Sequence, residues 1–184
     1  MSSTSQKPLI GISSCLAGNS VRYDGKHKLN SLIFDTLSEH AALLPICPEA
    51  MAGLGIPRPP VHIIQTGTYI QAIGKEYPDL NVTQALVQMG KIITRTYPNL
   101  CGFIAQSRSP SCGFGSTPIY NEKRILNRTG NGLFIEVLHQ QWPDMPILDH
   151  RNPSRSVLLA FFKQVTCYQN RRRTIQTTPT IPNE

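Results

Sequence analysis

The chain has 184 residues and a formal net charge of +7, from 18 Lys and Arg against 11 Asp and Glu. This length suits one domain with a small addition, and 40% hydrophobic residues are enough to form a core. No apolar run is long enough to span a bilayer, and residues 1–7 lack the apolar centre of a signal peptide, so we expect a cytoplasmic protein without a membrane partner. The five cysteines are then expected to be reduced, metal-bound or catalytic rather than joined in disulfides.

The positive charge is concentrated near the C-terminus, where Arg151 and Arg155 precede the run Arg171–Arg173. Without this segment the chain is only mildly basic. A single basic run is more typical of a solvated tail than of a surface that binds a groove of a nucleic acid. The distribution of charge therefore argues against nucleic acid as a partner. RNA binding through the arginine run is kept as an alternative, which predicts a steep dependence of binding on salt.

The first half of the chain predicts a strand, a helix and a second strand. Residues 8–14 form a short apolar run that reads as a buried strand ending at Cys15. Asn30 or Ser31 is expected to cap a helix with apolar residues to position 41. Residues 42–46 predict a strand ending at Cys47, and Pro45 indicates either an edge position or the start of a strand.

The second half predicts a hairpin at 61–73, a helix, and a buried strand at 101–105. We expect Thr83 to cap the helix, whose apolar side is expected to consist of Leu86, Val87, Ile92, Ile93 and Tyr97. After the strand, the pattern predicts a hairpin at 119–126 around 121–123, a helix beginning at 131–132, a strand at 145–148, and a helix opening at Pro153.

This order predicts an α/β fold, a Rossmann-like layered sandwich with a mostly parallel sheet and a C-terminal helical appendage. We expect the main domain at 8–149, the last helix with its basic run at 150–173, and a disordered tail at 174–184. The apolar face of the last helix either packs back on the main domain or contacts a second copy or another domain. The sequence carries no signal of the oligomeric state.

The densest chemistry lies at residues 107–113, directly after the strand predicted at 101–105. This stretch holds Arg108, Ser109, Ser111 and Cys112 in a loop stiffened by Pro110. Gly113 is expected to adopt backbone angles that other residues avoid. Open α/β sheets place their functional sites in such loops after buried strands.

Cys15, Cys47 and Cys112 each follow a predicted strand, and the carboxyl ends of parallel strands share one edge of a sheet. We therefore expect these three thiols to converge, whereas Cys101 begins a strand and Cys167 lies in the last helix. Thiolates suit a soft metal. Two alternatives stay open: zinc with His27 or His62 as a fourth ligand, or an iron–sulfur cluster with one iron left open.

Polar residues near these cysteines suit chemistry in which a metal acts as a Lewis acid on a substrate atom. Glu49, two residues after Cys47, is the candidate general acid or base, although a structural pairing with Arg58 also fits. Ser109 and Ser111 are candidates to orient a substrate or a water molecule. Candidate residues for binding the polar edges of a substrate are Arg22, Asp24, Arg58 and Arg108.

Three stretches in this order resemble the motifs of one family. They are Ile12–Gly18 with Val21–Gly25, Cys47–Glu49 with Gly53–Leu54 and Pro57–Pro60, and Ser107–Gly113. The chain thus resembles the thiouracil desulfidase (TudS) family, formerly a domain of unknown function, over about residues 8–149. It departs from the family pattern at Asn81 and at Ala52-Gly53, which bears on the substrate more than on the cluster.

The resemblance implies an oxygen-sensitive 4Fe-4S cluster held by Cys15, Cys47 and Cys112, and easily lost in air. It also implies an enzyme that hydrolyses the C–S bond of a small thiolated nucleobase such as 2-thiouracil and releases sulfide without net redox change. Glu49 would handle protons, helped by an acidic residue near Asp24 and by Ser109 or Ser111. The competing hypothesis is a non-catalytic accessory module whose cysteines hold a structural metal or a stored cluster.

Overall fold

The computed structural model describes residues 6–121, 124–151 and 153–177, and within them the chain forms two four-stranded sheets. Sheet A has the order β2 (Ala42–Ile46), β1 (Leu9–Ser13), β5 (Leu100–Ala105) and β8 (Ile147–Asp149), and all its neighbouring strands are parallel. Sheet B has the order β4 (Tyr69–Gly74), β3 (Val61–Thr66), β6 (Thr117–Tyr120) and β7 (Ile125–Gly130). The predicted α/β class with a mostly parallel sheet is confirmed.

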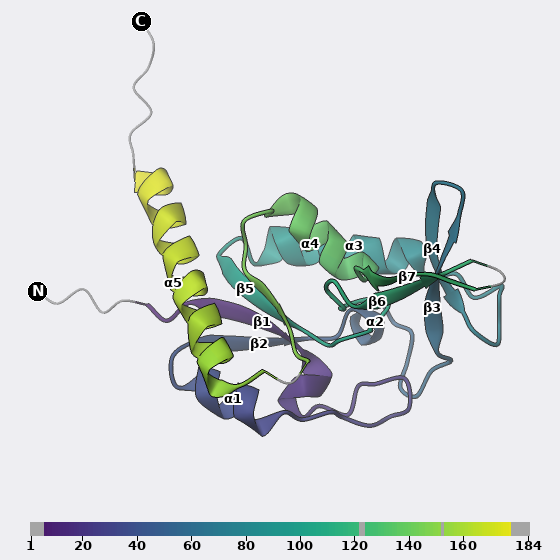
Figure 1. Cartoon of the computed structure of the whole chain (residues 1–184), viewed down its shortest axis with the longest axis horizontal. Coiled ribbons are helices and arrows are strands. Elements are labelled where there is room, and N and C mark those ends of the chain that lie inside the picture. Colours follow the sequence, from purple (N-terminus) through teal and green to yellow (C-terminus); the bar gives the residue numbers. More distant parts are fainter. Residues whose placement is uncertain (1–5, 122–123, 152, 178–184) are drawn as a thin grey trace, which may run out of the picture.

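Helices cover both faces of sheet A (Figure 1). The helices are α1 (Ser31–Ser38), α2 (Pro48–Met51), α3 (Thr83–Thr96), α4 (Leu133–Gln141) and α5 (Arg155–Thr177), with a short 3-10 helix at Ser14–Ala17. Phe103 of β5 packs on Phe134 of α4 with the ring centroids 5.7 Å apart. The next residue towards the N-terminus, Gly102, faces Val165 of α5, because successive strand residues point to opposite faces.

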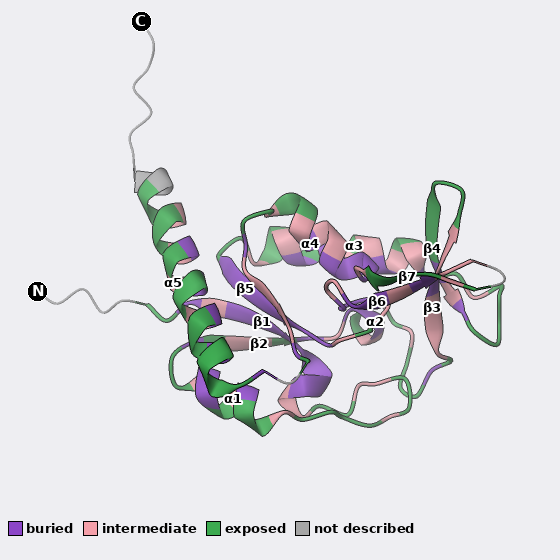
Figure 2. Ribbon diagram, viewed as in Figure 1, coloured by how far each residue is buried: buried purple, intermediate pink, exposed green. Residues whose placement is uncertain are grey.

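The core follows from the burial of these strands (Figure 2). All six residues of β5 are buried, as expected for a central parallel strand covered on both faces. β2 lies at the edge of sheet A, which accommodates Pro45 because an edge strand can lack a backbone N–H donor. Of the two alternatives that the sequence left for Pro45, the structure therefore has the edge position.

The C-terminal helix α5 packs on the main core. Leu158, Phe161, Val165 and Tyr168 are buried in the same hydrophobic cluster as β1 and β5. Of the two alternatives from the sequence, the structure therefore has the apolar face of α5 against the body of the protein. Arg172 reinforces this contact, since its guanidinium lies over the rings of both Trp142 and Tyr168 and donates to the carbonyl oxygen of Leu100.

Replacing Phe161 by alanine is expected to lower the free energy of unfolding by about 3–5 kcal/mol, because it leaves a cavity between α5 and β5. The side chain is 4% exposed and lies beside Gly102. Val157→Ala is the matched control on the same helix, since Val157 is 44% exposed and should change stability by no more than about 0.5 kcal/mol. Urea unfolding measures both. Equal small effects would mean that α5 contributes little to the core.

Several details differ from the sequence prediction. Thr83 does not cap α3: Val82 holds the N-cap position, and the Thr83 hydroxyl accepts the N–H of Ala72 instead. Ile92 is 47% exposed, so it lies outside the buried stripe of α3, which Leu86 and Ile93 form. The two predicted hairpins join through parallel pairing of β3 and β6, which makes sheet B. The last helix runs to Thr177, into the segment predicted as a tail, and residues 178–184 lie outside the described residues.

The predicted turn at 121–123 falls partly on residues 122–123, which also lie outside the described residues. Among the helices that the structure describes, none is both long and apolar enough to cross a membrane.

Candidate functional site

One cavity of about 570 Å³ opens at the carboxyl edge of sheet A. Cys15 follows β1, Cys47 follows β2, and Cys112 lies in the loop after β5, and all three cysteines line this cavity. β1 lies between β2 and β5, so the three chain segments leave the sheet side by side. The three cysteines that the parallel topology predicts at one edge therefore line the same cavity.

The environments of Cys15 and Cys112 favour the protonated form of their thiols in the free protein. Burial raises the pKa of Cys15 to about 11, although the nearby charge of Arg22 opposes the shift. Burial also raises the pKa of Cys112, against a hydrogen bond from the Ser13 hydroxyl. Because thiolates are the form that binds metals, loading this site must release protons from both residues.

The carboxylate of Glu49 is held at both oxygens inside the cavity. The Ser111 hydroxyl donates to Oε1 at 2.7 Å, and Arg58 Nε donates to Oε2 at 2.8 Å. Glu49 is 8% exposed and lies in the first turn of α2, a short helix that was not predicted from the sequence. Pro48 at the first helical position and the left-handed Gly53 just after the helix are the signals that could have found it.

The two serines of the loop have different contacts. Ser111 is 2% exposed and contacts Glu49, and its hydroxyl lies 3.8 Å from Cys112 Sγ. Ser109 Oγ instead accepts the backbone N–H groups of Ser111 and Cys112 at 3.3 and 3.0 Å. Ser109 therefore shapes the turn that carries Cys112, while Ser111 reaches the carboxylate.

Close packing fixes the loop. A side chain at Gly113 would overlap Thr117 Oγ1 and the carbonyl oxygen of Ser109. The expectation that Gly113 adopts unusual backbone angles is wrong, because it has no positive φ and is required by this close approach instead. Within residues 107–113, the positive φ belongs to Arg108, at 61°. The loop also satisfies the start of α4, since the carbonyl of Pro110 accepts the N–H of Leu133 at 3.0 Å.

The end of β8 supports the loop from the other side. Ser116 Oγ accepts the N–H of Arg108 at 3.0 Å and donates to Asp149 in a short hydrogen bond. His150 Nδ1 accepts the N–H of Ser107 at 2.8 Å. Burial and the charge of Lys28 lower the pKa of His150, against the charge of Asp149.

This shift predicts how stability depends on pH. The pKa of His150 in the folded chain lies below its ordinary value of 6.5, so the unfolded chain gains a proton first as the pH falls. The free energy of unfolding should therefore decrease from about pH 6.5 down to the folded pKa. The charged neighbours that act on His150 are Lys28, Asp149 and Arg151.

The measurement is urea unfolding between pH 5 and 8, with His150→Gln as the comparison. Glutamine can accept the Ser107 N–H but takes up no proton, so the variant should lose part of the dependence. An identical pH dependence in both proteins would contradict the role given to His150.

The predicted arginines occupy different positions around the cavity. Arg22 and Arg108 line it, with Arg108 exposed. Arg58 is buried and bonded to protein groups. Asp24 is exposed, does not line the cavity, and accepts from Arg22 Nε at 3.3 Å. Desolvation raises the pKa of Asp24, but hydrogen bonds from the Lys26 N–H and from Arg22 outweigh it and lower the pKa.

Several residues of the site were missed from the sequence. Ser13 accepts the N–H of Gln106 at 2.8 Å, and Gln106 Oε1 accepts a hydrogen bond from Cys15 Sγ at 3.8 Å. Lys28 and Lys75 add positive charge to the lining. Ser13 and Gln106 stand at the carboxyl ends of β1 and β5, and that position is the signal that could have found them.

Cysteine thiolates are the donors that hold iron–sulfur clusters, so the three cysteines are a donor set of the right chemical type. No group of three or more His, Cys, Asp or Glu side chains in the described residues converges closely enough to hold one metal ion. Thiolates around a four-iron cluster bind different irons, so they stand further apart than the ligands of one zinc. The candidate fourth zinc ligands lie elsewhere: His27 accepts the N–H of Leu29, and His62 stacks on Tyr120.

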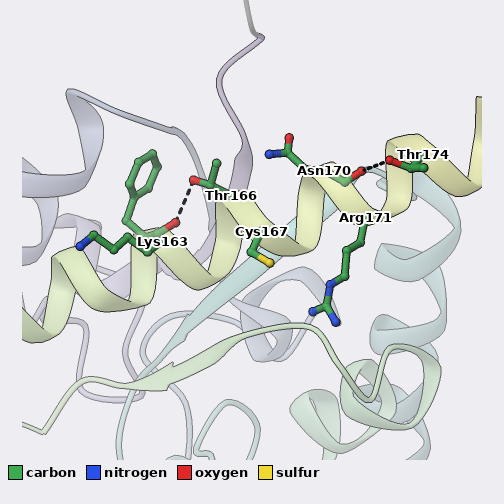
Figure 3. Close-up of a pocket in the computed structure, with 7 residues that line it drawn as sticks. Lys163, Thr166, Cys167, Asn170, Arg171 and Thr174 are labelled. Atoms are coloured by element: carbon green, nitrogen blue, oxygen red, sulfur yellow. Dashed lines mark hydrogen bonds between the residues drawn. The ribbon is translucent and has the colours of Figure 1, made fainter.

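The remaining cysteines lie away from this cavity. Cys101 is buried at the start of β5 and donates to the carbonyl oxygen of Asn99. Cys167 is exposed and lines a hollow formed by α5 alone, together with Lys163 and Arg171 (Figure 3). As expected from the sequence, neither cysteine lines the cavity of Cys15, Cys47 and Cys112.

Comparisons with known proteins point to one family. Residues 10–150 match the family model described as 2-thiouracil desulfurase. A Bacillus subtilis (strain 168) protein named "Uncharacterized protein YbbK" is 32% identical over 148 residues, which cover 72% of this chain and 90% of that protein. A solved structure described as a 4Fe-4S-dependent thiouracil desulfidase, TudS, is 27% identical, with a TM-score of 0.64, and the match covers 84% of this chain and 99% of that chain.

Proposed function

The chain belongs to the 2-thiouracil desulfurase family, and from this premise we propose that it is a 4Fe-4S-dependent enzyme that hydrolyses the C–S bond of a thiolated pyrimidine such as 2-thiouracil. Cys15, Cys47 and Cys112 would hold the cluster. When bound, the cluster supplies an iron with a free position, which is a Lewis acid for the sulfur atom of the substrate. Oxygen-sensitive chemistry on reduced thiols suits the proposed cytoplasmic location.

The observation that carries the proposal is a buried carboxylate in the same cavity as the three thiols. Hydrolysis replaces the C=S sulfur by the oxygen of a water molecule, and the sulfur leaves as hydrosulfide. Glu49 takes a proton from the attacking water and returns it to the products, so no electron donor is needed. Ser111, which donates to Glu49 Oε1 at 2.7 Å, orients the carboxylate. Ser109 acts by shaping the loop.

Cationic side chains at the cavity are proposed to bind the acceptor atoms of the pyrimidine. Arg108 extends from the loop after β5, and Arg22 from the loop after the short 3-10 helix. The carboxylate of Asp24 holds Arg22 at 3.3 Å, so Asp24 acts through Arg22. A fixed guanidinium suits the planar carbonyl edge of a nucleobase, since its N–H donors lie in one plane.

The test is anaerobic reconstitution with iron and sulfide, followed by incubation with 2-thiouracil. The expected result is a brown protein with about four irons per chain, as a cubane cluster requires, that releases sulfide and forms uracil. A brown protein without turnover on thiolated pyrimidines would favour the accessory module. A colourless protein, or one holding a single zinc, would favour a structural metal and overturn the proposal.

A further inference from the structure

Arg58 joins the carboxylate of Glu49 to the sulfur of Cys47. Its Nε donates to Glu49 Oε2 at 2.8 Å, and its Nη2 lies 3.9 Å from Cys47 Sγ. Arg58 lies in the loop between α2 and β3, nine residues after Glu49. Arg58 therefore contacts both the proposed acid–base residue and a proposed cluster ligand, as Ser111 does at the other oxygen of Glu49.

The hydrogen bonds of Arg58 to the protein leave few of its N–H groups free to bind a substrate. A guanidinium carries five N–H groups. Nη1 donates to the carbonyl oxygens of Val21 and Gly55, both at 3.0 Å, so with Nε and Nη2 four N–H groups are engaged. The side chain is 5% exposed, compared with 25% for Arg22 in the same cavity lining. Arg58 therefore lines the cavity, but its N–H groups are mostly engaged by the protein.

The contact continues across the cavity to the third cysteine. Glu49 accepts from Ser111 at 2.7 Å through its other oxygen, and the Ser111 hydroxyl lies 3.8 Å from Cys112 Sγ. A chain of polar contacts thus runs from Cys47 through Arg58, Glu49 and Ser111 to Cys112. It connects two loops that are far apart in the sequence, and Arg58 fixes one end of it.

We propose that Arg58 is a positioning residue that sets Glu49 relative to Cys47, and that it does not bind the substrate. This inference rests on the proposed function and replaces the substrate-binding role expected from the sequence. A lysine cannot take over the role, because one ammonium group lacks the planar fork that serves the carboxylate, two carbonyls and the sulfur together.

The first test compares Arg58→Gln and Arg58→Lys with the unchanged protein, all reconstituted anaerobically and assayed with 2-thiouracil. We expect kcat to fall by about 10- to 100-fold in both variants, as for other residues that orient metal ligands and their partners. KM should stay within about twofold, because no substrate contact is lost. An Arg58→Lys protein with full activity, or a raised KM with unchanged kcat, would overturn the proposal.

Two other arginine variants serve as controls for this test. Arg22→Gln should raise KM more than it lowers kcat, because Arg22 is proposed to touch the substrate. Arg128→Gln, at an exposed position on β7, should change neither constant. If Arg58→Gln behaves like Arg22→Gln, Arg58 binds substrate after all.

A second readout needs no turnover. The rate at which 2,2′-bipyridine removes iron from the loaded protein should rise by about tenfold or more in both Arg58 variants, because Cys47 loses an orienting partner. Should the unchanged protein load a cluster but leave 2-thiouracil intact, the proposed function fails while this comparison still decides the role of Arg58. Equal rates of iron release in all three proteins would contradict it.

The metal-free protein supplies a third measurement. Urea unfolding of Arg58→Gln, Glu49→Gln and the double variant forms a double-mutant cycle. The pair is buried, so we expect the double variant to be less destabilised than the sum of the single variants. Strict additivity would show that Arg58 does not hold Glu49, whether or not the protein takes up iron.

Discussion

Replacement of Glu49 by glutamine is expected to reduce kcat for desulfuration of 2-thiouracil by about 10²- to 10⁴-fold, the usual contribution of general acid–base catalysis. Glutamine keeps the size of the side chain but can neither take up nor return the proton of the attacking water. Its amide oxygen can still accept from Ser111, so the loop should keep its shape. Sulfide release from the anaerobically reconstituted protein measures the effect.

The cluster content of the same sample separates the two hypotheses for this protein. The variant should retain the visible absorbance and the iron content of the unchanged protein, because Glu49 is not among the proposed ligands. Glu39→Gln is a suitable control, since the Glu39 side chain is 67% exposed and lies outside the cavity. A Glu49→Gln protein with full turnover would mean that another group handles the proton.

Replacing Cys15, Cys47 or Cys112 by serine is expected to abolish both cluster retention and desulfuration. Each of the three side chains lines the same cavity, and a hydroxyl is a poor ligand for iron that prefers thiolate. Iron per chain after reconstitution should fall from about four towards zero, and sulfide release should fall to the background rate.

The remaining cysteines provide one exposed and one buried control. Cys167→Ser replaces an exposed thiol on α5, and Cys101→Ser replaces a buried one at the start of β5. Both proteins should load the cluster and turn over substrate as before. If all three cavity variants keep full activity, the cluster-dependent mechanism is wrong. If Cys101→Ser or Cys167→Ser loses iron, the ligand set has to be revised.

The periodicity of the sequence predicted the parallel core of the fold. Apolar runs of strand length at 8–14, 42–46 and 101–105, separated by a helical pattern in each interval, left a parallel sheet as the simple arrangement. Because the carboxyl ends of parallel strands share an edge, the same reasoning predicted that Cys15, Cys47 and Cys112 would converge. A continuous apolar run of strand length is a local property of the sequence, so it can be recognised without the tertiary structure.

Sheet B shows what local patterns leave out. Both of its hairpins were predicted, but their joining through parallel pairing of β3 and β6 was not, because that pairing connects segments more than 50 residues apart. The buried stripe of α3 likewise depended on which neighbours cover it, and Ile92 is exposed although it was predicted on the apolar side.

The sequence by itself determined which side chains are candidates for the chemistry: three strand-end cysteines, a carboxylate, two serines and the arginines around them. Only the tertiary structure decided how they are paired. Ser111 rather than Ser109 reaches Glu49, and Arg58 is buried against Glu49 while Arg108 is exposed at the cavity. The physical reason is that a hydrogen bond depends on angles and on distances of a few tenths of an ångström, which arise from packing between segments far apart in the chain.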